Sequence, residues 1–288
     1  MSELKKGNAA GFVAIMLWST LALFTVTTGA IPPFQLTFMT FFIAFFIALA
    51  YRFITTKRFF LSHSVPLKVW ALGIYGLFGY HFFYFLALKS APALEANLIN
   101  YLWPLLIVLF SALLPKEHLR WFHSAGALFG FLGAFLLLSA RGLSFSSEYA
   151  NGYVFAFLCA LIWSSYSVLS RYFGQVPTSV VGDFCGVTAL LSLGAHIFFE
   201  TFYMPTPTEL CAVIGLGIGP VGIAFFVWDY GMKKGDIKFI GALSYATPLL
   251  STLLLVASGQ TKPHTMIWVA CGLIILGSLI SSLGLKRS

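Results

Sequence analysis

The stretch from Glu95 to Pro104, EANLINYLWP, places a carboxylate, two amides, a phenol, an indole and a proline inside an apolar segment. Such polar groups are costly in a membrane span and usually mark a functional site. At helical spacing Asn97, Asn100, Tyr101 and Pro104 share one face. Because Pro104 has no N–H, the carbonyl of Asn100 loses its helical partner. We therefore expect a kinked helix whose polar face lines a solvated cavity.

A second interrupted helix is expected near the end of the chain, in the sequence SYATP. There Pro248 removes the helical partner of the Ser244 carbonyl, and Tyr245 lies beside it. Exposed carbonyls, hydroxyls and amides suit an ammonium group, and aromatic rings suit an apolar or aromatic side chain. An amino acid or a similar small metabolite fits this mixture, and a sugar fits nearly as well.

Two tryptophans are expected at the middle of the membrane. Trp18 and Trp163 fall at mid-span, whereas lipid-facing tryptophans gather at the membrane interfaces. Each is followed by a serine, Ser19 after the first, and Tyr166 shares a helix face with Trp163. These side chains are expected to line the cavity or to plug the space between helices.

A histidine and a carboxylate complete the candidate substrate-binding set. His81 has Tyr84 on its face, and a histidine near neutrality can carry protons; the alternative is a satisfied core side chain. Glu95 either pairs with Lys89 or attracts the amino group of a substrate. Pro220, in a glycine-rich segment, is expected with Pro104 and Pro248 to loosen its helix for gating, with close packing as the alternative.

The remaining intramembrane carboxylates are expected to serve structure. Asp183 is expected to pair with a base or a helix end at the cytoplasmic surface. Asp229 lies four residues before Lys233, which predicts a solvated ion pair.

The composition indicates an all-α integral membrane protein. The 288 residues are 59% hydrophobic and 9% charged with mean hydropathy +0.90, whereas soluble domains carry roughly 25% charged residues. A span needs about 20 apolar residues. Ten segments qualify, at 8–29, 32–51, 69–88, 93–114, 121–140, 152–170, 179–199, 210–230, 239–258 and 266–285.

The net charge of +8 is explained by topology. With a cytoplasmic N-terminus, most lysines and arginines fall on the cytoplasmic side, and only Lys89, Arg141 and Lys262 fall on the other. This follows the positive-inside rule, so both termini are expected in the cytoplasm and a nucleic-acid partner is not expected.

The two halves of the chain repeat. An offset of 145 matches Trp18 with Trp163, and an offset of 144 matches Tyr101 with Tyr245 and Pro104 with Pro248. The sequence thus predicts two five-helix repeats, 1–145 and 146–288. Because five is odd, the second repeat must be inverted, as in secondary transporters with a central cavity and alternating access.

The segments LWST, NYLWP, ALIWSSY and ALSYATP resemble the YddG-type amino acid exporters of the drug/metabolite transporter superfamily (EamA group). The resemblance covers nearly the whole chain. It implies export of amino acids, aromatic ones among them, from the cytoplasm across the inner membrane of a bacterium. It also implies cavity positions, which are Trp18, His81, Tyr84, Asn100, Tyr101, Trp163 and Tyr245.

Other functions find less support in the sequence. The four cysteines lie alone in separate spans, so neither disulfides nor a metal site is expected, and no cofactor motif occurs. An enzyme would need convergent catalytic groups, and no HExxH or GxSxG appears. We expect a monomer embedded in lipid. Export of sugars, nucleobases or cationic compounds, with or without proton coupling, stays as the alternative.

Overall fold

A computed structural model describes residues 2–59, 65–115, 117–140, 142–259 and 265–283. Every regular element within these ranges is helical. Nine helices or runs of helices there are long and apolar enough to cross a membrane. The tenth expected segment holds a shorter apolar helix, Met266–Ser282. The expected all-helical membrane protein is thus confirmed.

Five runs make up the first half of the chain. They are α1 (Glu3–Ser19) with α2 (Leu21–Thr27); α3 (Pro33–Thr56); α4 (Leu67–Ile74), η1 (Tyr75–Gly79) and α5 (Tyr80–Ser90); α6 (Ala93–Asn100), α7 (Trp103–Phe110) and η2 (Ser111–Leu113); and α8 (Trp121–Ser139).

The second half follows the same order. Its elements are η3 (Ser147–Tyr149) with α9 (Ala150–Tyr172); α10 (Val180–Phe199); α11 (Pro207–Ile218), η4 (Gly219–Ile223) and α12 (Ala224–Lys234); α13 (Ile237–Leu243) with α14 (Ala246–Ala257); and α15 (Met266–Ser282).

Both expected helix breaks occur, a few residues before the prolines. α6 ends before Tyr101 and α13 ends before Ser244. One detail of the expectation is wrong, because the Ser244 carbonyl is not left free. The chain tightens there into a shorter turn, and this carbonyl accepts the N–H of Thr247 at 3.0 Å. After the other break, the N–H of Leu105 donates to the Tyr245 hydroxyl at 3.1 Å instead of continuing the helical ladder.

The two glycine-rich spans each contain one π-helical turn. These turns, η1 and η4, begin at Tyr75 and Gly219, which are separated by the offset of 144 that relates the halves of the sequence. π-Turns inside α-helices are rare overall, and those that occur are often found at functional sites. Pro220 lies within η4.

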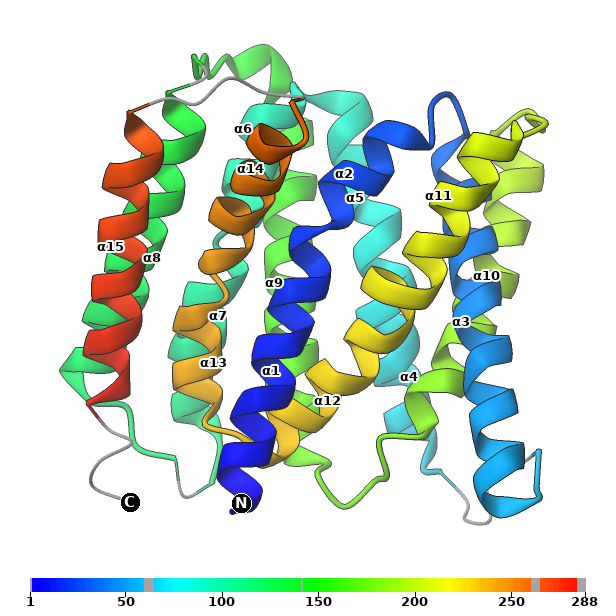
Figure 1. Cartoon of the computed structure of the whole chain (residues 1–288), viewed down its shortest axis with the longest axis horizontal. Coiled ribbons are helices and arrows are strands. Elements are labelled where there is room, and N and C mark those ends of the chain that lie inside the picture. The colour runs from blue at the N-terminus through cyan, green and yellow to red at the C-terminus, as the bar shows by residue number, and fades with distance from the viewer. Residues whose placement is uncertain (1, 60–64, 116, 141, 260–264, 284–288) are drawn as a thin grey trace.

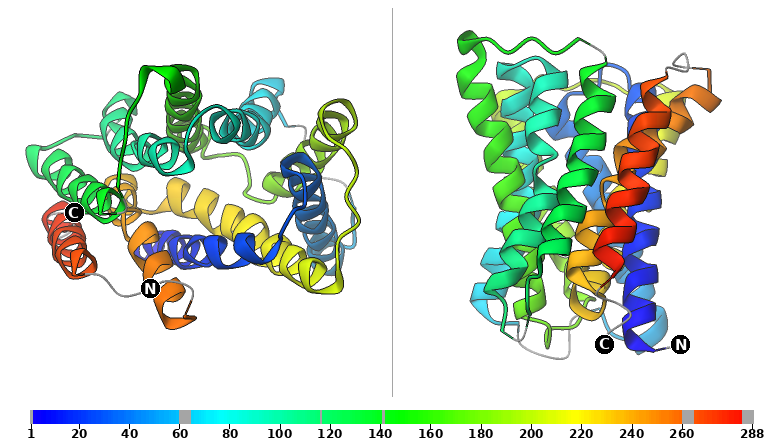
Figure 2. Two further views of the ribbon diagram at one scale, coloured as in Figure 1. Left: turned by 90° about the horizontal axis from the view of Figure 1, so that it is seen from above. Right: turned by 90° about the vertical axis from the view of Figure 1, so that its left-hand side faces the viewer.

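The helices stand side by side, and α1 begins at the same face of the molecule at which α15 ends (Figure 1). We call this the terminal face and the opposite one the far face. α8 packs against α15 at one end of the molecule, and α3 packs against α10 at the other (Figure 2). Between them α1 packs against α12, and α9 packs against α5 and α7.

Glycines set the close approach of α8 to α15. A Cβ atom on Gly126 would lie 2.4 Å from the carbonyl oxygen of Gly277, and one on Gly277 would lie 2.5 Å from that of Gly126. This pair therefore serves packing within the chain.

Candidate functional site

Four tryptophans from four helices meet at the centre of the molecule. Trp18 of α1 lies with its ring centroid 5.6 Å from that of Trp163 of α9 and 4.9 Å from that of Trp228 of α12. Trp103 of α7 adds a fourth indole, 5.7 Å from Trp228. Phe225 packs against Trp18 and Trp163 at 6.2 and 5.7 Å. We call these five side chains the tryptophan cluster.

Hydrogen bonds fix the orientation of two of the indoles. Trp18 Nε1 donates to the carbonyl oxygen of Pro220 at 3.0 Å, so the π-turn η4 holds the ring of α1. Trp228 Nε1 donates to Ser167 Oγ at 3.1 Å. Buried indoles usually find such an acceptor. These two bonds hold Trp18 and Trp228 in fixed orientations within the cluster.

A hydrogen-bonded layer of phenols and amides lies on the far-face side of the cluster, where α5 and α6 stand (Figure 1). Asn100 Nδ2 donates to the hydroxyl of Tyr80 at 2.9 Å. The hydroxyl of Tyr84 donates to Asn97 Oδ1 at 2.8 Å. The rings of Tyr80 and Tyr84 stack at 5.8 Å, and Tyr80 lies 5.6 Å from Trp163. The polar layer and the tryptophan cluster are therefore in contact.

One polar atom of this layer is unsatisfied. Among the described residues Asn100 Oδ1 has no hydrogen-bond partner, although Asn100 is only 6% exposed. By contrast, Asn97 uses both ends of its amide, because Nδ2 also donates to the carbonyl of Ala93 at 2.7 Å. A buried acceptor without a partner costs roughly 1–3 kcal/mol. Asn100 Oδ1 is thus a buried acceptor that is left without a hydrogen bond in this conformation.

His81 faces the same region. Its Nδ1 lies 2.7 Å from the carbonyl oxygen of Leu77, and since a carbonyl only accepts, Nδ1 carries the hydrogen. The ring stands edge-on to Phe41 at 5.1 Å and to Tyr80 at 5.2 Å. This arrangement leaves Nε2 as the ring nitrogen with a lone pair that can accept a hydrogen bond.

Four of the expected binding residues form hydrogen bonds with other parts of the chain in this conformation. The hydroxyls of Ser19 and Ser244, both buried, donate to carbonyls of their own helices, those of Met16 and Ile240. Tyr245 is fully buried and faces Leu105, away from the tryptophan cluster.

Glu95 is the fourth, and it braces a loop. Its side chain is buried, and Oε1 accepts the N–H of Ser144 at 2.7 Å, in the segment that joins the two halves. Within the described residues Glu95 and Lys89 form no ion pair, so that part of the expectation is wrong. The partner of the carboxylate is instead the backbone N–H of Ser144, in the loop after α8.

Tyr101, Pro104 and Pro248 lie at the two breaks. Tyr101 is half-buried and caps α6, Pro104 is the second residue of α7, and Pro248 is the third residue of α14.

Sequence reasoning passed over Tyr80, Trp103, Phe225 and Trp228. The repeat offset contains the signal for two of them, because adding 144 to His81 and Tyr84 gives Phe225 and Trp228. Tyr80 precedes Tyr84 by one helical turn and so shares its face.

Charged groups gather at the terminal face. Asp183 pairs with Arg52 at 2.6 Å, which confirms the expected partnership with a base. Asp229 pairs with Lys233 at 2.8 Å, as expected, but the pair is not solvated, because the two side chains are 4% and 6% exposed. The sequence did not reveal this burial because the segment between α9 and α10 covers the pair.

Comparison with known proteins identifies the family. The model of the EamA-like transporter family matches the chain twice, over residues 5–139 and 150–283. The chain belongs to the EamA-like transporter family. One relative in it, named aromatic amino acid exporter YddG, from Ancylobacter novellus, is 54% identical over 96% of this chain and 97% of its own.

Two more distant relatives carry different names. A Salmonella typhimurium protein, also named aromatic amino acid exporter YddG, is 24% identical over 98% of this chain and 99% of its own. An Escherichia coli protein named biotin transporter is 24% identical over 64% of this chain and 63% of its own. A crystal structure of a protein 54% identical to this chain matches the fold with a TM-score of 0.93, over 96% of this chain and 98% of that one.

Proposed function

We propose that this EamA-like transporter exports amino acids, aromatic ones among them, from the cytoplasm across the bacterial inner membrane. The observation that carries the proposal is the contact between the tryptophan cluster and the amide layer. An aromatic side chain stacks on indoles, and an ammonium group donates to the free Asn100 Oδ1. The name of the relative from Ancylobacter novellus supports the same substrate class.

The proposed substrate site is built around Trp18, Trp163, Tyr80, Tyr84 and Asn100. His81 and Asn97 border it, and Tyr101 lies beside it at the break. The half-buried state of His81, Tyr84 and Asn97 supports a surface that a small molecule reaches. Four other residues, Ser19, Glu95, Ser244 and Tyr245, position the helices that carry the site.

We also propose that the chain is two inverted five-helix repeats with ten spans. The double match of the family model and the placement of η1 and η4 at one offset support it. Alternating access would then rock one part of the molecule against the other around the central site. The clustering of basic residues at the terminal face supports cytoplasmic termini.

The test is flux of labelled amino acids in liposomes that hold the purified protein. We expect saturable uptake of L-phenylalanine above that of empty liposomes, reduced at least tenfold by Trp163→Ala, because that change removes the ring against which Tyr80 and Trp18 pack. An imposed pH gradient separates facilitated diffusion, with unchanged flux, from proton coupling.

A folded protein that carries none of the amino acids faster than empty liposomes would contradict the proposal. It would instead favour sugars, nucleobases or cationic compounds as cargo.

A further inference from the structure

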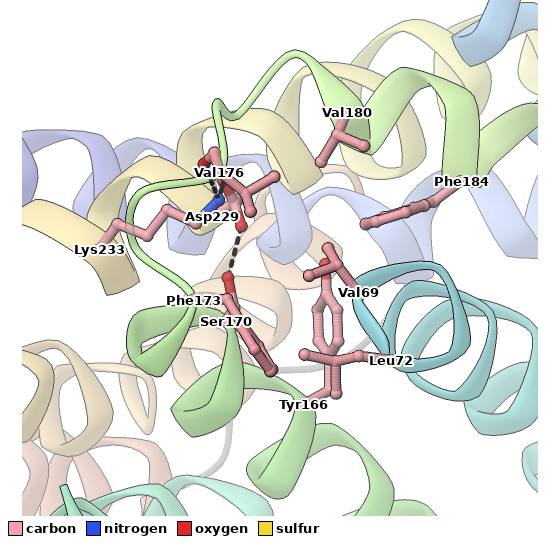
Figure 3. A pocket seen from close by; sticks show the side chains of 10 residues that line it. All are labelled: Val69, Leu72, Tyr166, Ser170, Phe173, Val176, Val180, Phe184, Asp229 and Lys233. Atoms are coloured by element: carbon pink, nitrogen blue, oxygen red, sulfur yellow. Dashed lines mark hydrogen bonds and ion pairs between the residues drawn. The ribbon is translucent and has the colours of Figure 1, made fainter. Parts of the chain in front are cut away.

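A small pocket lies between the tryptophan cluster and the terminal face (Figure 3). Its walls are mostly apolar side chains of α4, α9, α10 and the segment between α9 and α10, with Tyr166, Phe173 and Phe184 the largest, and α12 contributes Asp229 and Lys233. Tyr166 belongs to this pocket and also lies 5.3 Å from Trp163, ring to ring. The pocket is therefore next to the central site on the side from which an exporter loads.

The segment between α9 and α10, residues 173–179, covers this pocket. Asp229 accepts a hydrogen bond from Thr178 Oγ1 at 2.6 Å, and Lys233 Nζ donates to the carbonyl of Val176 at 2.9 Å. The pair thus ties the covering segment to α12. A third contact, Ser170 Oγ to Asp229 Oδ1 at 2.5 Å, anchors the carboxylate to α9 (Figure 3).

A buried ion pair at this position is not explained by stability. Removing two charges from water is expensive, and apolar side chains of similar volume stabilise a protein as well or better. The repeat does not require the pair either. Subtracting 144 from Lys233 gives Lys89, but subtracting 144 from Asp229 gives Phe85. At this repeat position a carboxylate therefore occurs in the second half of the chain only.

We propose that this pocket is a cytoplasmic loading site for a zwitterionic amino acid, which pairs its ammonium group with Asp229 and its carboxylate with Lys233. The inference rests on the proposed export function. When segment 173–179 lifts, the ligand takes the place of each residue's partner, and its side chain lies against Phe184 of α10. Tyr166, which lines the pocket and lies next to Trp163, connects the pocket to the central site.

The chemistry selects for a zwitterion. A ligand with both charges leaves neither Asp229 nor Lys233 unpaired, whereas a ligand with a single charge separates the pair and strands one buried charge. Phenethylamine and 3-phenylpropionate, which each have one of the two charges of phenylalanine, are therefore expected to bind more weakly at this pocket.

The first test measures transport kinetics from each side of the membrane. In inside-out vesicles, Lys233→Met is expected to raise the KM for L-phenylalanine at the cytoplasmic face at least tenfold. In right-side-out vesicles it is expected to change the KM by less than twofold, because the outer route does not pass the pocket. Equal effects on both faces, or no effect, would overturn the loading site.

The second test uses labelling and does not depend on transport by a variant. Val176→Cys is made in a background whose four natural cysteines are replaced by alanine, and inside-out vesicles are treated with a maleimide. We expect L-phenylalanine to slow labelling at least fivefold, and each singly charged analogue to slow it less than twofold. Gln175→Cys, at an exposed position of the same segment, is the matched control and should be unaffected.

Lys233→Met separates direct protection from a conformational effect of the central site. If substrate at the tryptophan cluster closed segment 173–179 by itself, protection of Val176→Cys would survive this change, and the proposal would be overturned. The proposed function is judged separately by wild-type flux. Flux without protection rejects only the loading site, whereas an absence of amino acid flux rejects export.

Discussion

At the residue scale, two asparagines of one helix have opposite states. In the side-chain amide of Asn97, the oxygen accepts from Tyr84 and the nitrogen donates to Ala93. In that of Asn100, the nitrogen donates to Tyr80 but the oxygen has no partner among the described residues. In the proposed site, this difference gives Asn97 a scaffolding role and leaves the Asn100 oxygen to bind the ligand. Spacing alone places both on one polar face and does not separate them.

We predict that Asn100→Ala raises the KM for L-phenylalanine about tenfold. A hydrogen bond to a charged group contributes roughly 1.5–3 kcal/mol, and 1.4 kcal/mol corresponds to a factor of ten. Asn97→Ala is the matched control and should raise the KM less than threefold. Concentration-dependent flux in liposomes measures both, and a larger effect at position 97 would reverse the two roles.

At the element scale, the π-turn η1 is fitted against α9. A Cβ atom on Gly76 would lie 2.2 Å from Cδ2 of Tyr166, closer than atoms pack, whereas a Cβ atom on Gly79 would have no neighbour within 4 Å. Gly76 therefore sets the position of the ring that separates the loading pocket from the tryptophan cluster.

We predict that Gly76→Ala displaces Tyr166 and lowers both the rate of amino acid flux, at least fivefold, and the Tm in detergent. Gly79→Ala lies in the same turn and should leave both near wild type. Flux and thermal unfolding of the two variants decide the matter. If both variants behave alike, the close approach of η1 to Tyr166 is not what limits transport.

At the scale of the whole molecule, ion pairs tie the two halves together at the terminal face. Glu117, between η2 and α8, receives hydrogen bonds from Arg171 at 2.6 Å and from Lys238. Arg171 also donates to the carbonyls of Met232 and Gly235, both at 2.8 Å. This network joins the two halves of the chain at the terminal face in the conformation described.

The network has a defined pH dependence. Burial raises the pKa of Glu117, but the hydrogen bond from Lys238 and the charge of Arg171 outweigh it, so the pKa lies below its usual value of 4.5. Because the folded-state pKa is lowered, the stabilisation is fully present above pH 4.5 and is lost as the pH falls through the folded-state pKa.

We predict that Glu117→Gln lowers the Tm at pH 7 by about 5 °C, because it leaves two cations without their carboxylate. It should also reduce the loss of Tm below pH 4.5. Thermal unfolding from pH 3 to 8 measures this, with the exposed Glu148→Gln as control. A Glu117→Gln profile that parallels the wild type at every pH would contradict the role of the network.

The sequence predicted the membrane spans closely, because apolar length and charged or proline-bearing breaks are local properties. It also predicted the two helix breaks and that Trp18 and Trp163 lie between helices, where their rings meet. It did not reveal the functions of Glu95 and Tyr245, because the partners of both side chains, Ser144 and Leu105, are brought near only by tertiary packing.

The π-turns η1 and η4 also bear on ancestry. A π-turn contains one residue more than the α-turn it replaces. Two such turns at corresponding positions, 75–79 and 219–223, are what the proposed repeat would leave if the ancestral half already carried the turn. On the same proposal, the carboxylate of Asp229, which has no counterpart at Phe85, arose after the two halves diverged.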